Sequence, residues 1–503
     1  MKFLALWEFA RKQDYIFKSN KLVEAIGASL IIKNVTENFK RYNLKDDNFL
    51  IRGGGKTLYA FDTLEEAKAF NKEFSVEILE KYDGLVLFMV ITPYDENKDD
   101  IRDVIDKIYG LLEEKKLARK NSCHQVSFGI ERPCQSTAMP ASFKENDEYI
   151  SKEIYVKRKF ARENQDASFR ELIPDNYELE RTIENFIGNN DKNYVGVIHI
   201  DGNSMGKKFK ELKNKVVKKN GESVKEFNER YVKTLRMFSE KVNEAYKEAF
   251  FFMTNEIEEN KDKLKDITEI ENGFFPIRPI ILAGDDITYI SNGFIAIETA
   301  RIFMEFLSNE EIIIEGINLG KLTSCAGVSL VKKGYPFIKA YEMAEELCAN
   351  AKKELIDENG EKRESSMIDF HVSQGEITCD INQIREKDYS LEGEKAILNM
   401  RPLLVGENYT WRNYDNFIET INNINKAIKE KSIGRNKIKS LRTEIKKGRE
   451  ATEHFFKFYN IKGGKFLRPV DGTLGDYTFN EKDGRCMYLD AIEIIDLFVK
   501  LEN

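Results

Sequence analysis

The most informative stretch of the sequence is Ile281-Leu282-Ala283-Gly284-Asp285-Asp286-Ile287-Thr288-Tyr289-Ile290. Two apolar runs flank Ala-Gly-Asp-Asp, a pattern typical of a tight β-hairpin whose tip carries adjacent carboxylates. Asp and Gly are common in turns, so the tip alone could be an ordinary turn. The apolar flanks, however, anchor the tip to a core and hold two like charges close together, which a bound cation would compensate.

A second acidic strand end precedes this hairpin in the chain. Val197–Asp201 reads as a buried strand, and the turn Gly202-Asn203-Ser204-Met205-Gly206 leads into a helix that we expect to begin near Lys207. The two glycines would let the backbone approach phosphates at a helix N-terminus. Alone, an Asp-Gly turn after a strand is a common loop. Its combination with the acidic hairpin, in this order, favours a metal site that binds a triphosphate.

The chemistry predicted for these carboxylates is nucleotidyl transfer from a nucleoside triphosphate. Magnesium prefers hard oxygen ligands and usually binds through one or two carboxylates plus substrate phosphates. Two Mg²⁺ or Mn²⁺ ions would activate a ribose hydroxyl towards the α-phosphorus and neutralise the departing pyrophosphate. We therefore predict Asp201, Asp285 and Asp286 as catalytic residues and metal ligands, with Ile200 as a further metal ligand.

Lys352 follows a predicted helix over Ala340–Ala351 and could meet the β- or γ-phosphate as a point charge, although a solvated lysine at a helix end fits the same pattern. The predicted nucleotide-binding residues around these carboxylates are Gly202, Asn203, Ser204, Met205, Gly206, Gly284 and Lys352, and the family resemblance described below adds Gly53, Gly54 and Gly55.

The chain contains two related α+β units. Residues 1–135 and about 193–355 share one order of strand, helical region, glycine-containing hairpin, helix and strand. Phe49–Ala60 parallels the acidic hairpin, so that Gly54 falls on Gly284, while Gly55-Lys56 replaces the acidic pair.

Apolar residues recur at helical spacing beside both hairpins. The predicted helices are Leu22–Val35, Leu64–Phe74, Ile101–Leu112, Phe294–Leu307 and Ile338–Ala351. Helices packed behind an antiparallel sheet are typical of a ferredoxin-like palm. We predict an α+β fold with two such palms and a C-terminal helical domain.

The predicted domains are a first palm at 1–135, an inter-palm linker at 136–192, a second palm at 193–375 and the helical domain at 376–503. The helical domain contains a basic stretch, Asn425–Glu450, with ten Lys or Arg against three Glu. Such a stretch is often a solvated helix face, but it could also contact RNA backbone or an acidic partner subunit.

Composition limits the function classes. The net charge of −7 argues against affinity of the whole chain for nucleic acid, and no apolar run reaches membrane-spanning length or the pattern of a signal peptide. We therefore expect a cytoplasmic protein without a membrane partner. The six cysteines contain no Cys-x-x-Cys. Cys123, His124 and Cys134 could be the remnant of a zinc finger, but we expect no bound zinc because a fourth ligand is missing.

With these motifs in place, the chain resembles the large polymerase-cyclase subunit of type III CRISPR effector complexes, the CRISPR Palm family related to GGDEF cyclases. The resemblance covers most of the chain. It is carried by Gln13-Asp14-Tyr15-Ile16-Phe17, Lys21-Leu22, Gly27-Ala28-Ser29, Gly53-Gly54-Gly55, Asp201–Gly206, Gly284-Asp285-Asp286, Cys325-Ala326-Gly327-Val328, Ala344-Glu345 and Ala351-Lys352.

The resemblance implies an activity and its partners. The two palms would face each other and bind two ATP molecules, one at the acidic palm and one near Gly53–Gly55, to make cyclic oligoadenylate messengers after target RNA binds. The partners would be guide RNA, target RNA and other subunits of the complex, including small helical subunits packed on the C-terminal domain.

Three departures from the family pattern matter. None of the four histidines is followed by Asp and the first palm starts at residue 2, so we expect a Cmr-type subunit without the HD nuclease domain and without DNase activity. The zinc-finger segment is degenerate. Ala283 replaces the first Gly of the usual Gly-Gly-Asp-Asp.

Two other functions stay open. AMP could be joined to a different cosubstrate such as S-adenosylmethionine, because the altered hairpin leaves the acceptor undetermined. Alternatively, the chain could be a catalytically silent, RNA-binding scaffold, although a scaffold gains little from clustered carboxylates.

Overall fold

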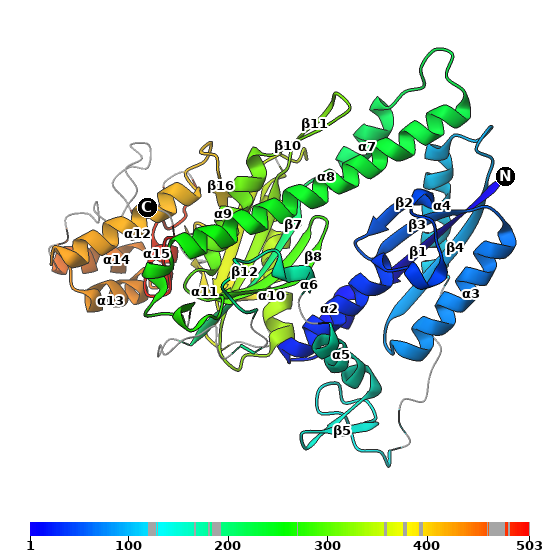
Figure 1. Cartoon of the computed structure of the whole chain (residues 1–503). Coiled ribbons are helices and arrows are strands. Elements are labelled where there is room, and N and C mark those ends of the chain that lie inside the picture. Colours follow the sequence, from blue (N-terminus) through cyan, green and yellow to red (C-terminus); the bar gives the residue numbers. More distant parts are fainter. Residues whose placement is uncertain are drawn as a thin grey trace.

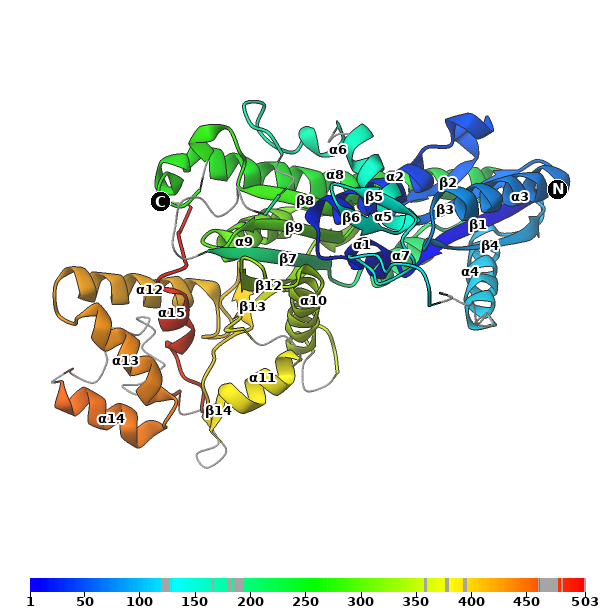
Figure 2. The ribbon, with the colours of Figure 1, turned by 90° about the horizontal axis from the view of Figure 1, so that it is seen from below.

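The structure of the chain is a computed structural model. It describes residues 1–118, 127, 129–164, 167–179, 182–183, 193–268, 270–356, 360–375, 380–391, 396–459, 461, 478–480 and 483–501. Two sheet-and-helix units lie next to each other, and a helical unit lies at the end away from the first (Figures 1 and 2). The predicted α+β class with a helical C-terminal part is confirmed. None of the described helices is long and apolar enough to cross a membrane.

The first unit contains a four-stranded antiparallel sheet in the order β2-β3-β1-β4. Its strands are β1 (Lys2–Ala10), β2 (Phe49–Gly53), β3 (Lys56–Phe61) and β4 (Val86–Tyr94). Helices α2 (Leu22–Glu37) and α3 (Leu64–Lys81) cover the face that carries Trp7, whose ring contacts Phe70 and Phe74 of α3. Helix α4 (Ile101–Leu117) reaches Glu8 on the other face through Lys116, because successive strand residues point to opposite faces.

The second unit contains a six-stranded sheet in the order β16-β13-β12-β7-β9-β8. Its strands are β7 (Tyr194–Gly202), β8 (Ile277–Ala283), β9 (Asp286–Asn292), β12 (Ser324–Lys332), β13 (Ser366–Val372) and β16 (Leu403–Val405). Only β12 and β13 pair in parallel. The last strand, β16, comes from beyond residue 375, so this sheet continues into the segment that we had assigned to the helical domain.

The helices of the second unit are α7 (Met205–Lys215), α8 (Val224–Glu259), α9 (Ala296–Asn309) and α10 (Phe337–Glu354). Helix α8 begins with a capping box in which Ser223 and Glu226 satisfy each other's backbone N–H groups. Its N-terminal half reaches the first unit, where the Arg236 guanidinium donates to the Phe49 carbonyl at 2.6 Å. A short hairpin, β10 (Glu311–Ile314) and β11 (Ile317–Lys321), lies beside α8.

The two units repeat one topology. The strand order β2-β3-β1-β4 recurs as β8-β9-β7-β12, and α4 follows β4 as α10 follows β12. A short helix follows the first strand of each unit, α1 (Lys12–Phe17) and α7, and each is preceded by a non-glycine residue in the left-handed region, Arg11 at φ 52° and Ser204 at φ 57°. The predicted duplication is therefore confirmed.

All five helices predicted from apolar spacing are present as α2, α3, α4, α9 and α10. The described residues of the predicted linker between the units include strands and helices. It forms β5 (Phe143–Glu145), β6 (Glu148–Ile150), α5 (Lys152–Glu163) and α6 (Ala167–Arg170). Helix α5 presses on α2, where a Cβ on Gly27 would lie 1.9 Å from the Lys157 carbonyl oxygen. Cys134 is buried beside Ile150 and Ile154, whereas Cys123 and His124 lie outside the described residues.

The C-terminal part is helical, as predicted. It contains α11 (Ile381–Asp388), α12 (Tyr414–Lys429), α13 (Arg435–Ile445), α14 (Arg449–Phe458) and α15 (Leu489–Ile494), with the short strands β14 (Ser390–Leu391) and β15 (Ala396–Ile397). The remaining elements are 3₁₀ turns at Lys40–Tyr42, Asp46–Asn48, Lys261–Leu264 and Ile270–Asn272.

The basic stretch Asn425–Glu450 does not form one continuous helix. It is divided among α12, α13 and α14, because Gly434 and Gly448 interrupt it as N-caps. Several of its charges are used internally. Arg435 and Lys439 pair with Asp496, and Arg442 pairs with the buried Glu493 at 2.9 Å. Part of the charge surplus therefore holds the C-terminal segment in place.

Candidate active site

The antiparallel pairing of β7 with β9 brings the predicted carboxylates together. Asp201 and Asp286 are direct register partners, so their side chains lie on one face with Cβ atoms about 5 Å apart. Asp285 occupies the turn between β8 and β9, and its carbonyl accepts a hydrogen bond of 3.1 Å from the Gly202 backbone N–H. Three acidic residues from two strand ends thus meet at one edge of the second sheet.

Burial and mutual repulsion destabilise the charged forms of two of these groups. Burial, together with the Asp201 carboxylate, raises the pKa of Asp285 to about 6. Burial also raises the pKa of Asp286 to about 6, although the Lys12 ammonium opposes this shift. The Oδ1 atom of Asp286 is buried and has no hydrogen-bond partner among the described residues. These carboxylates are a set of oxygen donors that a cation would satisfy.

We had expected Lys352 to follow the end of a helix, but it lies within α10. Its ammonium forms an ion pair with Asp201 and donates to the Gly202 carbonyl at 3.2 Å. Burial lowers the pKa of Lys352, but the hydrogen bond to Asp201 and the negative charge of that carboxylate, with smaller effects from nearby groups, together outweigh burial, so the net shift is upward. The lysine therefore stays charged next to the predicted metal ligands.

The turn Gly202–Gly206 begins with a closely packed glycine and ends with a glycine that has free space around it. A Cβ on Gly202 would lie 2.5 Å from the Tyr246 hydroxyl oxygen, so this position requires glycine. The Asn203 side chain is buried and donates to the Ser365 carbonyl at 2.9 Å, so it is not available to a nucleotide in this structure. Around Gly206, by contrast, a Cβ would meet nothing within 4 Å. Met205 is the first residue of α7.

The glycine hairpin of the first unit faces this site. Gly53, Gly54 and Gly55 all have positive φ, at 133°, 61° and 81°, so this turn depends on glycine. The Lys12 ammonium donates to the Gly54 carbonyl, and burial lowers the pKa of Lys12. Gly284, at the equivalent tip of the acidic hairpin, has φ 69°.

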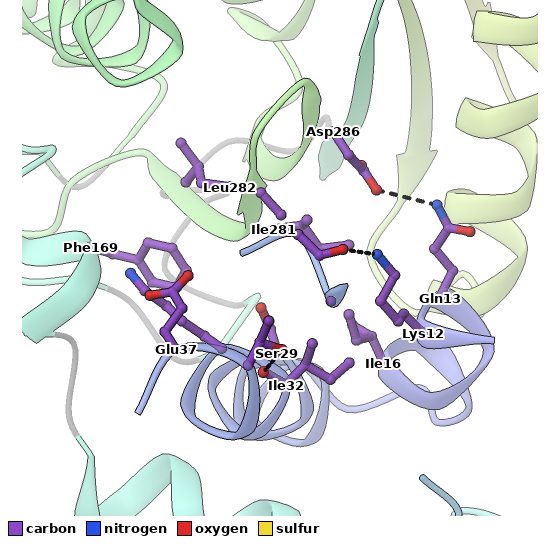
Figure 3. Close-up of a pocket in the computed structure, with 15 residues that line it drawn as sticks. Lys12, Gln13, Ile16, Ser29, Ile32, Glu37, Phe169, Ile281, Leu282 and Asp286 are labelled. Atoms are coloured by element: carbon purple, nitrogen blue, oxygen red, sulfur yellow. Dashed lines mark hydrogen bonds between the residues drawn. The ribbon is translucent and has the colours of Figure 1, made fainter. Parts of the chain in front are cut away.

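A pocket of about 530 Å³, including space open to solvent, lies between the two hairpins. Figure 3 shows Lys12 and Gln13 of α1 near Asp286, and Ile281 and Leu282 of β8 above α2. Its lining residues come from both units and include Ser29, Thr36, Glu37, Gly54, Gly55, Phe169, Ala283 and Asp286. The Gln13 side chain donates to Asp286 at 3.4 Å. Residues of the first unit thus complete the acidic site of the second.

Sequence reasoning missed four residues at this site: Lys12, Gln13, His199 and Tyr246. Gln13 was noted only as part of a family signature, and no pattern in the sequence shows that α1 crosses to the second unit. His199 is buried two residues before Asp201, and its Nδ1 lies 3.7 Å from Asp286 Oδ1 and 3.2 Å from the Thr288 hydroxyl. The period of a strand could have found His199, because residues i and i+2 share a face.

The carboxylate oxygens of the site are suitable ligands for a divalent metal ion, although the described residues alone do not form a complete coordination shell. Among the described residues, no group of three or more His, Cys, Asp or Glu is arranged to hold a metal ion by itself. Two facing carboxylates completed by substrate phosphates are the usual arrangement for Mg²⁺. Ile200 lies between Ile287 and Ala326 with its side chain fully buried, so only its backbone carbonyl could contribute.

The first unit carries an equivalent cluster with different charge. Glu8 faces Lys56 across β1 and β3, at the positions that Asp201 and Asp286 occupy in the second unit. Lys116 of α4 pairs with Glu8 at 2.9 Å, as Lys352 of α10 pairs with Asp201. In the first unit an ammonium group replaces the second carboxylate, so the single carboxylate of this cluster is paired with two ammonium groups and needs no metal ion.

The fold and site define a class of protein: a pair of palm-like units with one acidic hairpin and one glycine hairpin around a shared pocket. A comparison with models of known protein families matches none of them, and a comparison with curated protein sequences finds no similar one.

Solved structures with a similar fold include cassettes of Csm1 with Csm4. A crystal structure of the apo Csm1-Csm4 cassette matches with TM-score 0.55 at 13% identity, covering 100% of this chain and 70% of the other. The cassette in complex with cA3 matches with TM-score 0.55 at 13% identity over 99% and 69%. The cassette in complex with pppApApA matches with TM-score 0.53 at 14% identity over 100% and 69%. At these identities the likeness establishes the fold.

Proposed function

We propose that this chain is a metal-dependent nucleotidyltransferase that converts ATP into a cyclic oligoadenylate-type second messenger as a subunit of a type III CRISPR effector complex. The observation that carries this proposal is the register pair Asp201–Asp286, in which Asp286 lines a pocket together with Gly54 and Gly55. The fold shared with cassettes that bind cA3 and pppApApA supports the same activity.

Each element of the site has a role in this reaction. Asp201 and Asp286, with Asp285 beside them, would hold divalent ions, which when bound lower the pKa of the attacking hydroxyl and neutralise pyrophosphate. Lys352 would add positive charge beside the phosphates, and the N-terminus of α7 at Met205 and Gly206 would present backbone N–H groups to them. The second ATP would occupy the pocket next to Gly54 and Gly55.

The test is product analysis. The complex with guide RNA, purified and supplied with labelled ATP, Mg²⁺ or Mn²⁺ and target RNA, should release pyrophosphate and form oligoadenylates that mass spectrometry identifies. The variant Asp285→Ala/Asp286→Ala should form less than about one-hundredth of this product. Equal product from both proteins would remove the acidic hairpin from the reaction.

A second acceptor is supported by one observation. Ala283, which replaces a glycine of the family pattern, lines the pocket together with Ile281 and Glu37. The side of the pocket that would receive the acceptor is therefore altered, and AMP could be joined there to a cosubstrate such as S-adenosylmethionine. Reactions with and without that cosubstrate, analysed for AMP conjugates, would distinguish it from ATP as the acceptor.

Two further results would identify a scaffold function and the type of the complex. A complex that binds target RNA but consumes no ATP in Mg²⁺ or Mn²⁺ would be a scaffold. The subunits that copurify with the chain would show whether the complex is of the Cmr type implied by the sequence or of the Csm type of the similar structures.

A further inference from the structure

A buried hydroxyl lies directly beneath the acidic site without a partner. Tyr246 belongs to α8, is 1% exposed, and its hydroxyl has no hydrogen-bond partner among the described residues. Most buried hydroxyls are hydrogen-bonded, because burial without a bond is unfavourable. An isolated hydroxyl in such a place therefore points to a group that it meets in another state of the site.

Two contacts fix where this hydroxyl points. A Cβ built on Gly202 would lie 2.5 Å from the Tyr246 hydroxyl oxygen and 2.7 Å from Asp285 Cβ. The hydroxyl and Asp285 Cβ are therefore separated by about the space of one methyl group. The aromatic ring packs near Phe303, with ring centroids 6.0 Å apart, so its orientation is set by the core between α8 and α9.

Asp201 and Asp286 each accept a hydrogen bond or ion pair from another side chain, whereas Asp285 accepts none from the described residues. Lys352 holds Asp201, and Gln13 donates to Asp286. Among the described residues, no side chain donates a hydrogen bond to Asp285, which is tied to Gly202 only through its backbone carbonyl. A carboxylate extends beyond Cβ, so rotation of the Asp285 side chain can bring an oxygen to the Tyr246 hydroxyl.

We propose that Tyr246 is a positioning residue that donates a hydrogen bond to the Asp285 carboxylate when a divalent ion is bound. This inference rests on the proposed function, because it concerns the same carboxylates. Hydrogen-bond partners behind a metal ligand orient it, and removing one usually weakens metal binding 10- to 100-fold. Gly202 is then required because any side chain would separate the two groups.

The experiment measures Mn²⁺ binding to the chain by electron paramagnetic resonance, with no nucleotide and no turnover. Tyr246→Phe removes only the hydroxyl and should raise the dissociation constant for Mn²⁺ about tenfold. The control Tyr231→Phe changes a buried tyrosine further towards the N-terminus of the same helix and should leave the constant within twofold. Thermal unfolding should show no loss of stability in Tyr246→Phe, because the lost hydroxyl has no partner in the metal-free protein.

A double-mutant cycle tests whether the hydroxyl acts through Asp285. In the Asp285→Asn background, Tyr246→Phe should change Mn²⁺ affinity less than twofold, because its acceptor has been altered. Equal Mn²⁺ affinity of wild type and Tyr246→Phe, or an undiminished effect in the Asp285→Asn background, would overturn the inference and leave the proposed function intact. A wild-type protein that neither binds Mn²⁺ nor forms product would overturn the proposed function itself.

Discussion

Gln13 of the first unit donates a hydrogen bond of 3.4 Å to Asp286 of the second unit. The two residues lie far apart in the sequence, yet the carboxylate that begins β9 is oriented from α1. The acidic site is therefore incomplete in the second unit alone.

The first prediction concerns this contact. Gln13→Ala should lower the rate of product formation about fivefold, because one hydrogen bond to a carboxylate contributes on the order of 1 kcal/mol. Steady-state rates with saturating ATP and target RNA measure the effect. Gln383→Ala, which changes an exposed residue of α11, is the control. Rates for Gln13→Ala that match this control would contradict the role of the contact.

The second prediction is a pH dependence of metal binding. The pKa values of Asp285 and Asp286 are raised to about 6, so protons compete with metal below that pH. Mn²⁺ affinity should be constant above about pH 7 and fall at least tenfold between pH 7 and pH 5. Asp285→Asn should make the fall shallower. An affinity independent of pH over this range would show that these carboxylates do not bind the ion.

The third prediction is that the site destabilises the metal-free protein. The folded-state pKa of Asp286 lies above the unfolded value of 3.8, so the folded protein disfavours the charged form above about pH 6. Asp286→Asn should therefore be more stable than wild type at pH 7.5 without metal, by about 3 kcal/mol. The gain should shrink as pH falls through 6 and vanish near pH 4. Unfolding in urea at several pH values measures it, and added Mg²⁺ should stabilise wild type only.

The fourth prediction uses the repeat as its control. Lys352→Met leaves Asp201 without its ion pair and removes positive charge from the proposed phosphate site, so product formation should fall about 100-fold. Lys116→Met breaks the equivalent pair with Glu8 in the first unit and should leave the rate within about threefold. Similar losses in both variants would show that the pairs act on folding and not on the reaction.

The fifth prediction separates packing from backbone access. A Cβ on Gly327 would lie 1.9 Å from the Ala344 carbonyl oxygen, so Gly327→Ala should push α10 off β12 and destabilise the fold by about 3 kcal/mol or more. Gly206→Ala meets nothing within 4 Å and should leave the melting temperature unchanged. If phosphates approach the start of α7, Gly206→Ala should still raise the KM for ATP several-fold. An unchanged KM would place the phosphates elsewhere.

Local sequence patterns predicted much of the fold. Apolar spacing predicted five helices, and the alignment of Gly54 with Gly284 predicted two equivalent hairpins because turn chemistry and strand alternation are local properties. The meeting of Asp201 with Asp286 followed from the order of the motifs. The α+β class, the duplication and the helical C-terminal part are therefore legible in the sequence.

The contacts between the two units could not be predicted from the sequence. Gln13 and Tyr246 reach the site from helices whose positions depend on packing across the whole molecule. Lys352 was expected just after a helix, either near a phosphate or in solvent, but its ammonium pairs with Asp201 of β7, far away in the chain. The charge of the basic stretch was read as exposed, whereas Arg442 is bound to the buried Glu493. Such pairings depend on tertiary distance, which composition and period do not encode.

Helix α8 is a long, continuous element that contacts both units. With 36 residues it is about 54 Å long, and it grips the first unit through Arg236 and carries Tyr246 under the acidic hairpin. The helix thus contacts the first unit through Arg236 and lies beside Gly202 of the second unit through Tyr246, and it runs past both units (Figure 1). Because α8 is one continuous helix, the spacing of these two contacts is fixed along its axis, and α8 joins the two units together with the contacts that α1 and α2 make to the second unit.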